Sequence, residues 1–298
     1  SGIEWNQLTD NYKKNKEILE NIYCHKNNIT LEYPSYYTRP FHGYDTGNLN
    51  WEAALEGEAA TLSMAVNYWK GNDPLTTEQW LRHNITKNLL TYIDETKSNR
   101  PNCVLDVGSS VGISTEYLYT SLYECDQMSG IDLSPYFVSL ATFRSMQENY
   151  PIEYVHQNAE TPHFDKKFDL ITVFRFFPNA EPDLRKKALK YLSDHIKDNG
   201  YIILNNHRNF WSIPFSLGRL LFLSDGFGMT HKEIDNLLEK NNLKLIKFFS
   251  IGLFTAREKS KIIPWNIIRL MENLFFKAFK GKHKLGYNVI YILKKKHD

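Results

Sequence analysis

The sequence predicts an α/β fold, in which helices cover both faces of a mostly parallel sheet. An apolar run at residues 104–107 leads into a turn that carries Gly108 and Gly112, where glycine permits a close approach of backbone or ligand. Residues 128–133 follow as a second strand, and residues 152–161 alternate apolar with polar side chains before a polar cluster. Strands that pass through turns into helices present unpaired N–H groups at one edge of a sheet. The three segments therefore predict a nucleotide-type site at that edge.

The turn departs from the fingerprint of dinucleotide-binding proteins, Gly-x-Gly-x-x-Gly. With Gly108 as the first glycine, Ser110 and Ile113 stand at the second and third glycine positions. Asp106 lies at the end of the preceding strand, where a carboxylate suits a cationic ligand group better than a phosphate. Asp132 lies about 20 positions beyond the turn, where ribose hydroxyls need an acceptor. A positively charged nucleoside is therefore favoured, and an NAD-type oxidoreductase is the weaker alternative.

On these residues the sequence resembles the class I S-adenosylmethionine-dependent methyltransferases. Their first motif is an acidic residue followed by x-Gly-x-Gly-x-Gly, which the chain matches at Asp106, Gly108 and Gly112 and departs from at Ser110. The resemblance is strongest over residues 100–205. It implies a seven-stranded Rossmann-like sheet, S-adenosyl-L-methionine as cofactor, S-adenosyl-L-homocysteine as product, and methyl transfer by direct displacement without a metal.

The resemblance also implies where the cofactor lies. The turn and Asp106 would hold its methionine end, Asp132 its ribose, and the Asn158 carbonyl oxygen with the Ala159 N–H its adenine. A histidine that many relatives carry after the fourth strand, 168–174, is missing, so no catalytic base is carried over from there. The expected cofactor-binding residues are Asp106, Gly108, Ser109, Ser110, Gly112, Asp132, Leu133, Asn158, Ala159, Phe174 and Tyr37.

The segment before the core predicts a helical cap with a lid, over residues 1–100, ahead of a core at 101–298. Helices are expected at 11–23, at 51–69 and from Thr76 to Ile93. Glu52 and Glu56 stand one helical turn apart, a spacing that suits a cationic substrate or acid–base chemistry, although a solvated helix face is its commoner meaning.

Residues 33–51 form a loop dense in aromatic side chains, proline and glycine, a composition typical of binding loops. We expect this loop to fold over the cofactor, with Tyr37, His42 and Tyr44 near the sulfonium or the methyl acceptor. A surface loop held by aromatic packing is the alternative.

The candidate acceptor site follows the fourth and fifth strands. Residues 183–195 are amphipathic, Asn199-Gly200 is expected to end that helix, and residues 201–204 form the next strand. His207 then becomes a candidate general base, together with His42 and Tyr44, although a lone histidine is more often structural. Arg175 and Arg208 are candidate substrate-binding residues, Arg208 as an anchor for an acidic group.

Insertions are expected at about 206–240 and 254–285, before and after the strand at 245–249. The last strand, at 287–293, is expected to be antiparallel, as the resemblance to the methyltransferases implies. Residues 262–284 join apolar surface to a run of lysines. A helix packed against the core is the first interpretation, and a lid over an apolar pocket or a peripheral membrane contact stays open. The insertions favour a bulky or partly apolar, even aromatic, organic acceptor.

Composition narrows the classes of partner. The net charge of +2 is too small to favour nucleic acid, and the chain lacks the Asn/Asp-Pro-Pro-Tyr signature of many nucleic-acid methyltransferases. The three cysteines form no C-x-x-C pair, which predicts neither a disulfide framework nor a zinc site and favours a reducing, cytoplasmic compartment. No leader is visible at the start, and no run reaches the ~20 apolar residues of a membrane span. We expect a monomer or homodimer that acts on a small molecule; a regulatory protein that binds the cofactor without turnover is the alternative.

Overall fold

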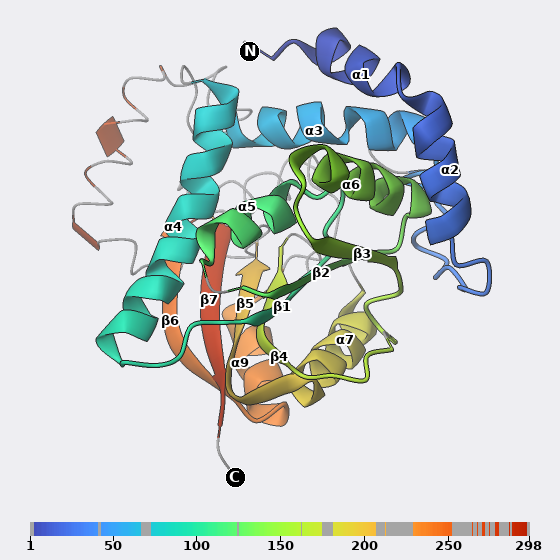
Figure 1. The fold of residues 1–298 in the computed structure, drawn as a ribbon. Helices are drawn as coiled ribbons and strands as arrows, with labels where there is room; N and C mark the ends of the chain where they lie inside the picture. Colours follow the sequence, from blue (N-terminus) through green and yellow to red (C-terminus); the bar gives the residue numbers. More distant parts are fainter. Residues whose placement is uncertain are drawn as a thin grey trace.

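A seven-stranded sheet forms the centre of the computed structural model, in the order β3-β2-β1-β4-β5-β7-β6 (Figure 1). The strands are β1 (Cys103–Val107), β2 (Gln127–Asp132), β3 (Ile152–His156), β4 (Phe168–Val173), β5 (Ile196–Asn206), β6 (Leu243–Ile251) and β7 (Asn288–Lys295). The structure describes residues 3–40, 43–66, 73–123, 125–161, 163–174, 181–206, 212, 229–251, 264, 267, 270–271, 274, 278–279, 286 and 288–296.

The sheet is parallel from β3 to β5, and β7 runs antiparallel to both β5 and β6. The predicted mostly parallel sheet and its antiparallel last strand are thus confirmed. Parallel strands align their carboxyl ends at one edge, so the tips of β1, β2 and β3 meet where the turn begins.

Helices cover both faces of the sheet, as the sequence predicted. They are α1 (Trp5–Lys13), α2 (Lys16–Lys26), α3 (Trp51–Val66), α4 (Pro74–Glu95), α5 (Ile113–Ser121), α6 (Pro135–Glu148), α7 (Pro182–Asp194) and α9 (His231–Lys240). On one face, Leu89 of α4 and Leu118 of α5 are buried with Val104 of β1. On the other face, Leu192 of α7 and Leu237 of α9 are buried in one cluster with strand residues.

The N-terminal helices α2 and α3 pack against α6. Leu19, Ala54 and Leu140 are buried together with Val111 of the glycine turn. Gly57 makes this close approach possible, because a Cβ there would lie 2.7 Å from Val111 Cγ1. The N-terminal segment is therefore placed directly against the turn that the sequence singled out.

Two local predictions were wrong. The expected helix over 11–23 is two helices, because α1 ends at Lys13 and α2 begins at Lys16. Asn199-Gly200 does not end α7 but lies inside β5, beside a break in the β4–β5 register, where Asn199 takes a positive φ of 67°. The helix ends earlier, with its C-cap at His195. The predicted N-caps Ser134 and Thr230 are confirmed, since each side chain accepts a backbone N–H of its helix.

Within the described residues, no helix has the length and apolar character that crossing a bilayer requires. Most of the insertion expected at about 206–240 and most of the segment 262–284 lie outside the described residues.

Candidate functional site

The glycine turn between β1 and α5 has three residues in the left-handed backbone region. Gly108 has φ 73°, Ser110 φ 52° and Gly112 φ 90°. Serine at φ 52° carries a steric penalty of roughly 1–2 kcal/mol that glycine avoids. The departure from the motif at Ser110 therefore preserves the conformation of the turn, because the serine adopts the backbone that a glycine would have taken.

Neighbouring strands hold the turn closely. The N–H groups of Gly108 and Ser109 both donate to the Ile131 carbonyl of β2, at 2.9 Å each. A Cβ on Gly112 would lie 2.7 Å from the Tyr154 hydroxyl oxygen and 3.1 Å from Ala141 Cβ. The turn thus has room for glycine alone at Gly112, beneath β3 and α6.

Asp132 connects the turn to the start of α6. Its Oδ2 accepts the Ser110 N–H at 2.9 Å, and its Oδ1 accepts the Ser134 N–H at 2.9 Å and the Tyr37 hydroxyl at 3.3 Å. Burial raises the pKa of Asp132, and the two backbone N–H groups oppose that rise. The structure therefore brings together four predicted features: the turn, the tip of β2, the start of α6 and the loop that carries Tyr37.

Asp106 is enclosed more deeply than Asp132. It is fully buried, and its oxygens accept three hydroxyl groups: Ser114 at 2.7 Å, Thr115 at 2.8 Å and Thr172 at 2.6 Å. Burial raises its pKa, and these hydroxyls oppose the rise. From the sequence, Asp106 was expected to contact a cationic group of the ligand. The structure shows in addition that Asp106 joins α5 to β4 through these hydroxyl groups, which the sequence did not predict.

The tip of β3 holds the residues expected near adenine. Asn158 Oδ1 accepts the Glu160 N–H at 2.9 Å, so a turn contact occupies the oxygen that was expected to accept from adenine. Ala159 is buried in the core. Glu160 also accepts the Tyr36 hydroxyl at 3.1 Å, which ties the cap loop to this strand tip.

His156, which the sequence interpretation missed, holds the segment between α2 and that loop. Its Nδ1 accepts the Asn28 N–H at 2.9 Å, so Nε2 carries the proton and donates to the Leu133 carbonyl at 3.1 Å. Burial lowers the pKa of His156. Alternation along β3 was the available signal, because it places His156 on the same side of the strand as the buried Tyr154.

A second missed group is the buried ion pair of α4. Arg82 Nε and Nη2 each lie 2.7 Å from Glu78 Oε1, and its guanidinium lies 5.2 Å from the ring centre of Phe174. Arg82 also lowers the pKa of Asp106. Phe174, which was expected at the cofactor, thus packs against the Arg82 guanidinium. The only sequence signal for the Glu78–Arg82 pair was its i,i+4 spacing, which allows a salt bridge on one helix.

Tyr44 is partly buried and packs against the hydrophobic cluster that includes Val111 of the turn. Its hydroxyl donates to Glu56 Oε2 at 2.5 Å, and burial together with Glu56 raises the pKa of Tyr44. Glu52 is exposed. The remaining candidates, His42, Arg175, His207 and Arg208, lie outside the described residues. In the part of the chain that the structure describes, no three histidine, cysteine or acidic side chains are grouped to hold a metal ion.

Comparisons with known proteins agree with this arrangement. Residues 104–200 match the family model of a methyltransferase domain. A structure of an S-adenosylmethionine-dependent methyltransferase from Clostridium acetobutylicum is similar with a TM-score of 0.58 and 14% identity, covering 81% of this chain and 99% of that one. No curated protein matches the chain.

Two further solved structures share the fold. A chain from the complex of the Haloferax volcanii Trm112 methyltransferase activator with a putative methyltransferase has a TM-score of 0.56 and 14% identity, with coverage of 84% and 99%. The magnesium protoporphyrin IX methyltransferase from Synechocystis, with bound S-adenosylhomocysteine, has a TM-score of 0.51 and 11% identity, with coverage of 80% and 95%. Residues 104–200 therefore match a methyltransferase domain family, and the chain shares its fold with these solved methyltransferase structures.

Proposed function

We propose that the protein binds S-adenosylmethionine at the tips of β1, β2 and β3 and transfers its methyl group to a small or medium-sized organic acceptor. The observation that carries this proposal is the contact between the glycine turn and Asp132, in which Ser110 N–H donates to Oδ2 at 2.9 Å. It joins an open carboxylate at a strand tip to a turn of left-handed residues. The match to a methyltransferase domain, the neighbour named for S-adenosylmethionine and the neighbour with bound S-adenosylhomocysteine support the same donor.

The residues present fit the donor's nucleoside. Asp132 is partly exposed, and a carboxylate offers about four lone-pair positions, of which three are used. The weakest of the three is the Tyr37 hydroxyl at 3.3 Å, so a ribose hydroxyl can join Tyr37 or replace it. Leu133, Asn158 and Ala159 surround the neighbouring strand tips, where we place the adenine; the turn residues Gly108, Ser109 and Gly112 border the methionine end.

The bound donor supplies a methyl group on a sulfonium, which is already an excellent leaving group. The chain's own task is then to align an acceptor oxygen, nitrogen or carbon with that methyl group and to accept a proton where one is released. Tyr44 remains a protonated phenol at neutral pH, because its pKa is raised, so it serves as a hydrogen-bond donor. Glu56, which accepts that hydroxyl, is the group that can take a proton beside it.

We assign acceptor recognition to the segments after β4 and β5, with His42 and His207 as further candidate bases and Arg175 and Arg208 as candidate anchors. An organic acceptor with apolar surface fits the apolar insertions of the sequence. Cys24, Cys103 and Cys125 form no disulfide, which supports a cytoplasmic location. A monomer or homodimer remains our expectation for the assembly.

Calorimetric titration with S-adenosylhomocysteine and with NAD tests the donor. Binding of the first without the second supports the proposal; NAD binding alone would favour the oxidoreductase alternative. A screen of organic acceptors with a methyl-labelled donor then tests turnover. Donor binding without any labelled product across amine, hydroxyl and carbon acceptors would favour a regulatory cofactor-binding protein.

A further inference from the structure

The segment that follows α2, residues 27–40, lies against the tips of β2 and β3; we call it the connecting segment. Its Tyr37 hydroxyl donates to Asp132 at the end of β2, at 3.3 Å. Tyr33 stacks on Tyr37, with ring centres 6.2 Å apart. The connecting segment therefore borders the proposed donor site, on which the following inference rests.

His156, the last residue of β3, contacts the connecting segment through both ring nitrogens. Asp132 and His156 are register partners on neighbouring parallel strands. The Asn28 N–H donates to Nδ1 at 2.9 Å, and the Tyr33 hydroxyl lies 3.2 Å from Nε2, which donates to the Leu133 carbonyl. One imidazole thus connects the start of the segment to the strand tips beside Asp132.

The contact with Asn28 requires a neutral imidazole. A backbone N–H can only donate, so Nδ1 must offer a lone pair, and a proton on Nδ1 would set two donors against each other at 2.9 Å. Nε2 carries a proton in both states and keeps its bond to the Leu133 carbonyl. A protonated His156 therefore stays bonded to Leu133 and loses Asn28, the residue through which it holds the start of the connecting segment.

The charged and titratable groups around His156 come from each element that packs against it. Asp132, its register partner on β2, favours a protonated ring, whereas Lys26 at the end of α2 disfavours it and lies with Nζ 2.9 Å from the Tyr154 carbonyl of β3. Burial raises the pKa of Tyr33 and of Tyr154, so both phenols stay uncharged. Burial lowers the pKa of His156, so the ring is neutral at pH 7 and is protonated only in acid.

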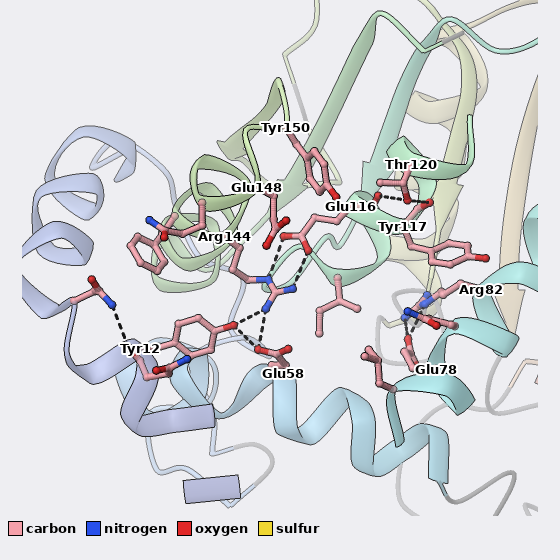
Figure 2. A pocket seen from close by; sticks show the side chains of 17 residues that line it. Tyr12, Glu58, Glu78, Arg82, Glu116, Tyr117, Thr120, Arg144, Glu148 and Tyr150 are labelled. Atoms are coloured by element: carbon pink, nitrogen blue, oxygen red, sulfur yellow. Dashed lines mark hydrogen bonds and ion pairs between the residues drawn. The ribbon is translucent and has the colours of Figure 1, made fainter. Parts of the chain in front are cut away.

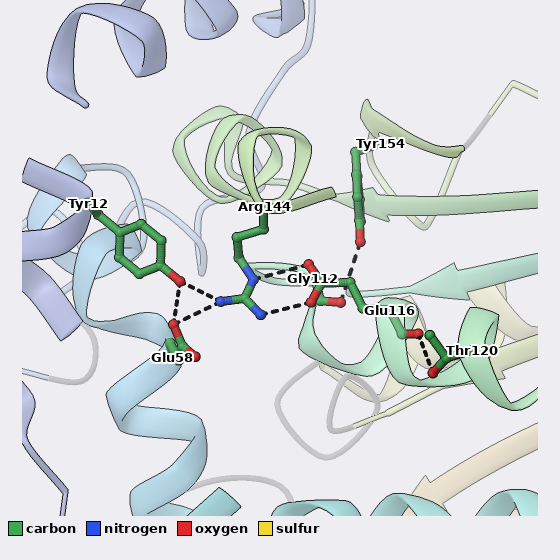
Figure 3. Close-up of polar contacts among 7 residues, drawn as sticks. All are labelled: Tyr12, Glu58, Gly112, Glu116, Thr120, Arg144 and Tyr154. Carbon is green, nitrogen blue, oxygen red and sulfur yellow. Dashed lines mark hydrogen bonds and ion pairs between the residues drawn. The ribbon is translucent and has the colours of Figure 1, made fainter. Parts of the chain in front are cut away.

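The N-terminal helices have an attachment of their own, which does not involve His156. One guanidinium on α6 donates to side chains of α1, α3 and α5, and Figure 2 shows it among them. The members of this cluster are Arg144, Tyr12, Glu58 and Glu116. Figure 3 adds the hydroxyl of Tyr154, which donates to the Gly112 carbonyl at 3.4 Å and holds β3 against the glycine turn. Loss of the Asn28 contact therefore leaves the helices and β3 attached and releases the connecting segment.

We propose that His156 is a positioning residue for donor binding: its neutral ring holds the connecting segment over the donor, and its protonation releases that segment and weakens the binding of S-adenosylmethionine. Release lets Tyr37 leave Asp132, so water reaches the carboxylate and competes with the ribose hydroxyls for it. Because the donor-bound form favours the neutral ring, donor binding to the protonated protein expels a proton. Donor affinity thus falls in acid while the fold persists.

Calorimetric titration with S-adenosylhomocysteine from about pH 8 to about pH 5.5 tests this coupling on the full chain. We expect the affinity to fall by up to about tenfold per pH unit below the pKa that His156 has in the donor-free protein. In two buffers of different ionisation enthalpy, the binding enthalpies should show the release of up to about one proton per ligand in this range. Circular dichroism at each pH confirms that the protein is folded.

Two variants of His156 separate its charge from its hydrogen bonds. His156→Gln keeps an acceptor and a donor but does not titrate, so it should bind as the wild type does at about pH 8 and keep that affinity in acid. His156→Leu has neither group and should bind about fivefold or more weakly at every pH. His25→Gln is the matched control, because His25 is an exposed histidine on α2 near the connecting segment, and it should keep the wild-type pH profile.

Backbone NMR of the donor-free wild type detects the release without any variant, so it decides the matter even if His156→Gln does not fold. The amide signals of Asn28 and Tyr37 should shift with the midpoint at which the His156 ring titrates. Signals that stay fixed through that titration, or a His156→Gln variant with the wild-type pH profile, overturn the proposal. Absence of S-adenosylhomocysteine binding at about pH 8 is a different result, because it would refute the donor site itself and this inference with it.

Discussion

Replacing Asp132 by asparagine separates the carboxylate's contribution to folding from its contribution to donor binding. The two oxygens of Asp132 accept different backbone N–H groups, Ser134 at Oδ1 and Ser110 at Oδ2, each at 2.9 Å. Asparagine keeps one oxygen, so its NH₂ group must face one of these two donors. One hydrogen bond is lost, and one buried N–H is left without its acceptor.

The size of each effect follows from this geometry. Loss of that hydrogen bond costs about 1–3 kcal/mol of unfolding free energy. For a chain of 298 residues, an unfolding entropy of about 2.1 cal/mol/K per residue converts this cost into a fall in Tm of about 2–5 °C. Loss of the charged acceptor for a ribose hydroxyl costs about 1.5–3 kcal/mol of binding free energy, so affinity for S-adenosylhomocysteine should fall by about 10- to 100-fold.

Thermal unfolding and calorimetric titration with S-adenosylhomocysteine measure the two effects on the same preparation. Asp126→Asn is the matched control, because Asp126 precedes the opposite, amino end of β2, where it is exposed and, among the described residues, accepts a hydrogen bond from the Asn102 side chain alone. A variant whose Tm falls by the expected amount, but which binds S-adenosylhomocysteine within twofold of the wild type, would refute the reasoning. Asp132 would then support the turn without contacting the donor.

Three further substitutions probe the surroundings of the site. Gly112→Ala should lower the unfolding free energy by about 1–3 kcal/mol in denaturant titrations, because its Cβ would lie 2.7 Å from the Tyr154 hydroxyl oxygen at φ 90°; an equally stable variant would contradict the close packing. Arg144→Met should cost about 3–5 kcal/mol by the same measurement, since Glu58 and Glu116 lose the cation between them, and Arg144→Lys should recover part of that loss. His156 has a lowered pKa in the folded protein, so the unfolded state binds more protons and stability should fall as the pH drops below about 6.5. His156→Gln should flatten that part of the pH profile, and an unchanged slope would assign it to other groups.

The fold around the glycine turn was predictable because its signals are local. A glycine turn after an apolar run, an acid at a strand tip and a serine before a proline each specify a backbone feature within a few residues. The structure accordingly confirms the sheet, the helices on both faces and the N-cap at Ser134. The prediction that Asn199-Gly200 ends a helix was wrong, because asparagine and glycine also occur at irregular points of strands, as they do here in β5.

Contacts between distant segments had no comparable signal. Arg144 joins Glu116, Glu58 and Tyr12, which lie 28, 86 and 132 positions away in the sequence. On its own helix, each of these glutamates is an ordinary polar residue, and only the packing of α1, α3, α5 and α6 brings them together. The same holds for His156, whose partner Asn28 lies 128 positions away.

Asp106 and Asp132 share one sequence signal, an acid at a strand tip, yet their depth in the sheet differs. Asp106 lies inside the ladder, level with Gly130 and Thr172, whereas Asp132 is the last residue of β2. The first turn of α5 therefore covers Asp106 with hydroxyl groups, while Asp132 stays partly exposed.

This difference predicts that the two acids divide their roles. Asp106→Asn should reduce affinity for S-adenosylhomocysteine less than Asp132→Asn does. Its effect on stability should shrink as the pH rises from about 4, because the raised pKa of Asp106 makes the wild-type protein lose stability through that range. A larger loss of donor affinity from Asp106→Asn than from Asp132→Asn would contradict the argument, since a carboxylate beneath α5 would then contribute more to binding than the one at the open tip.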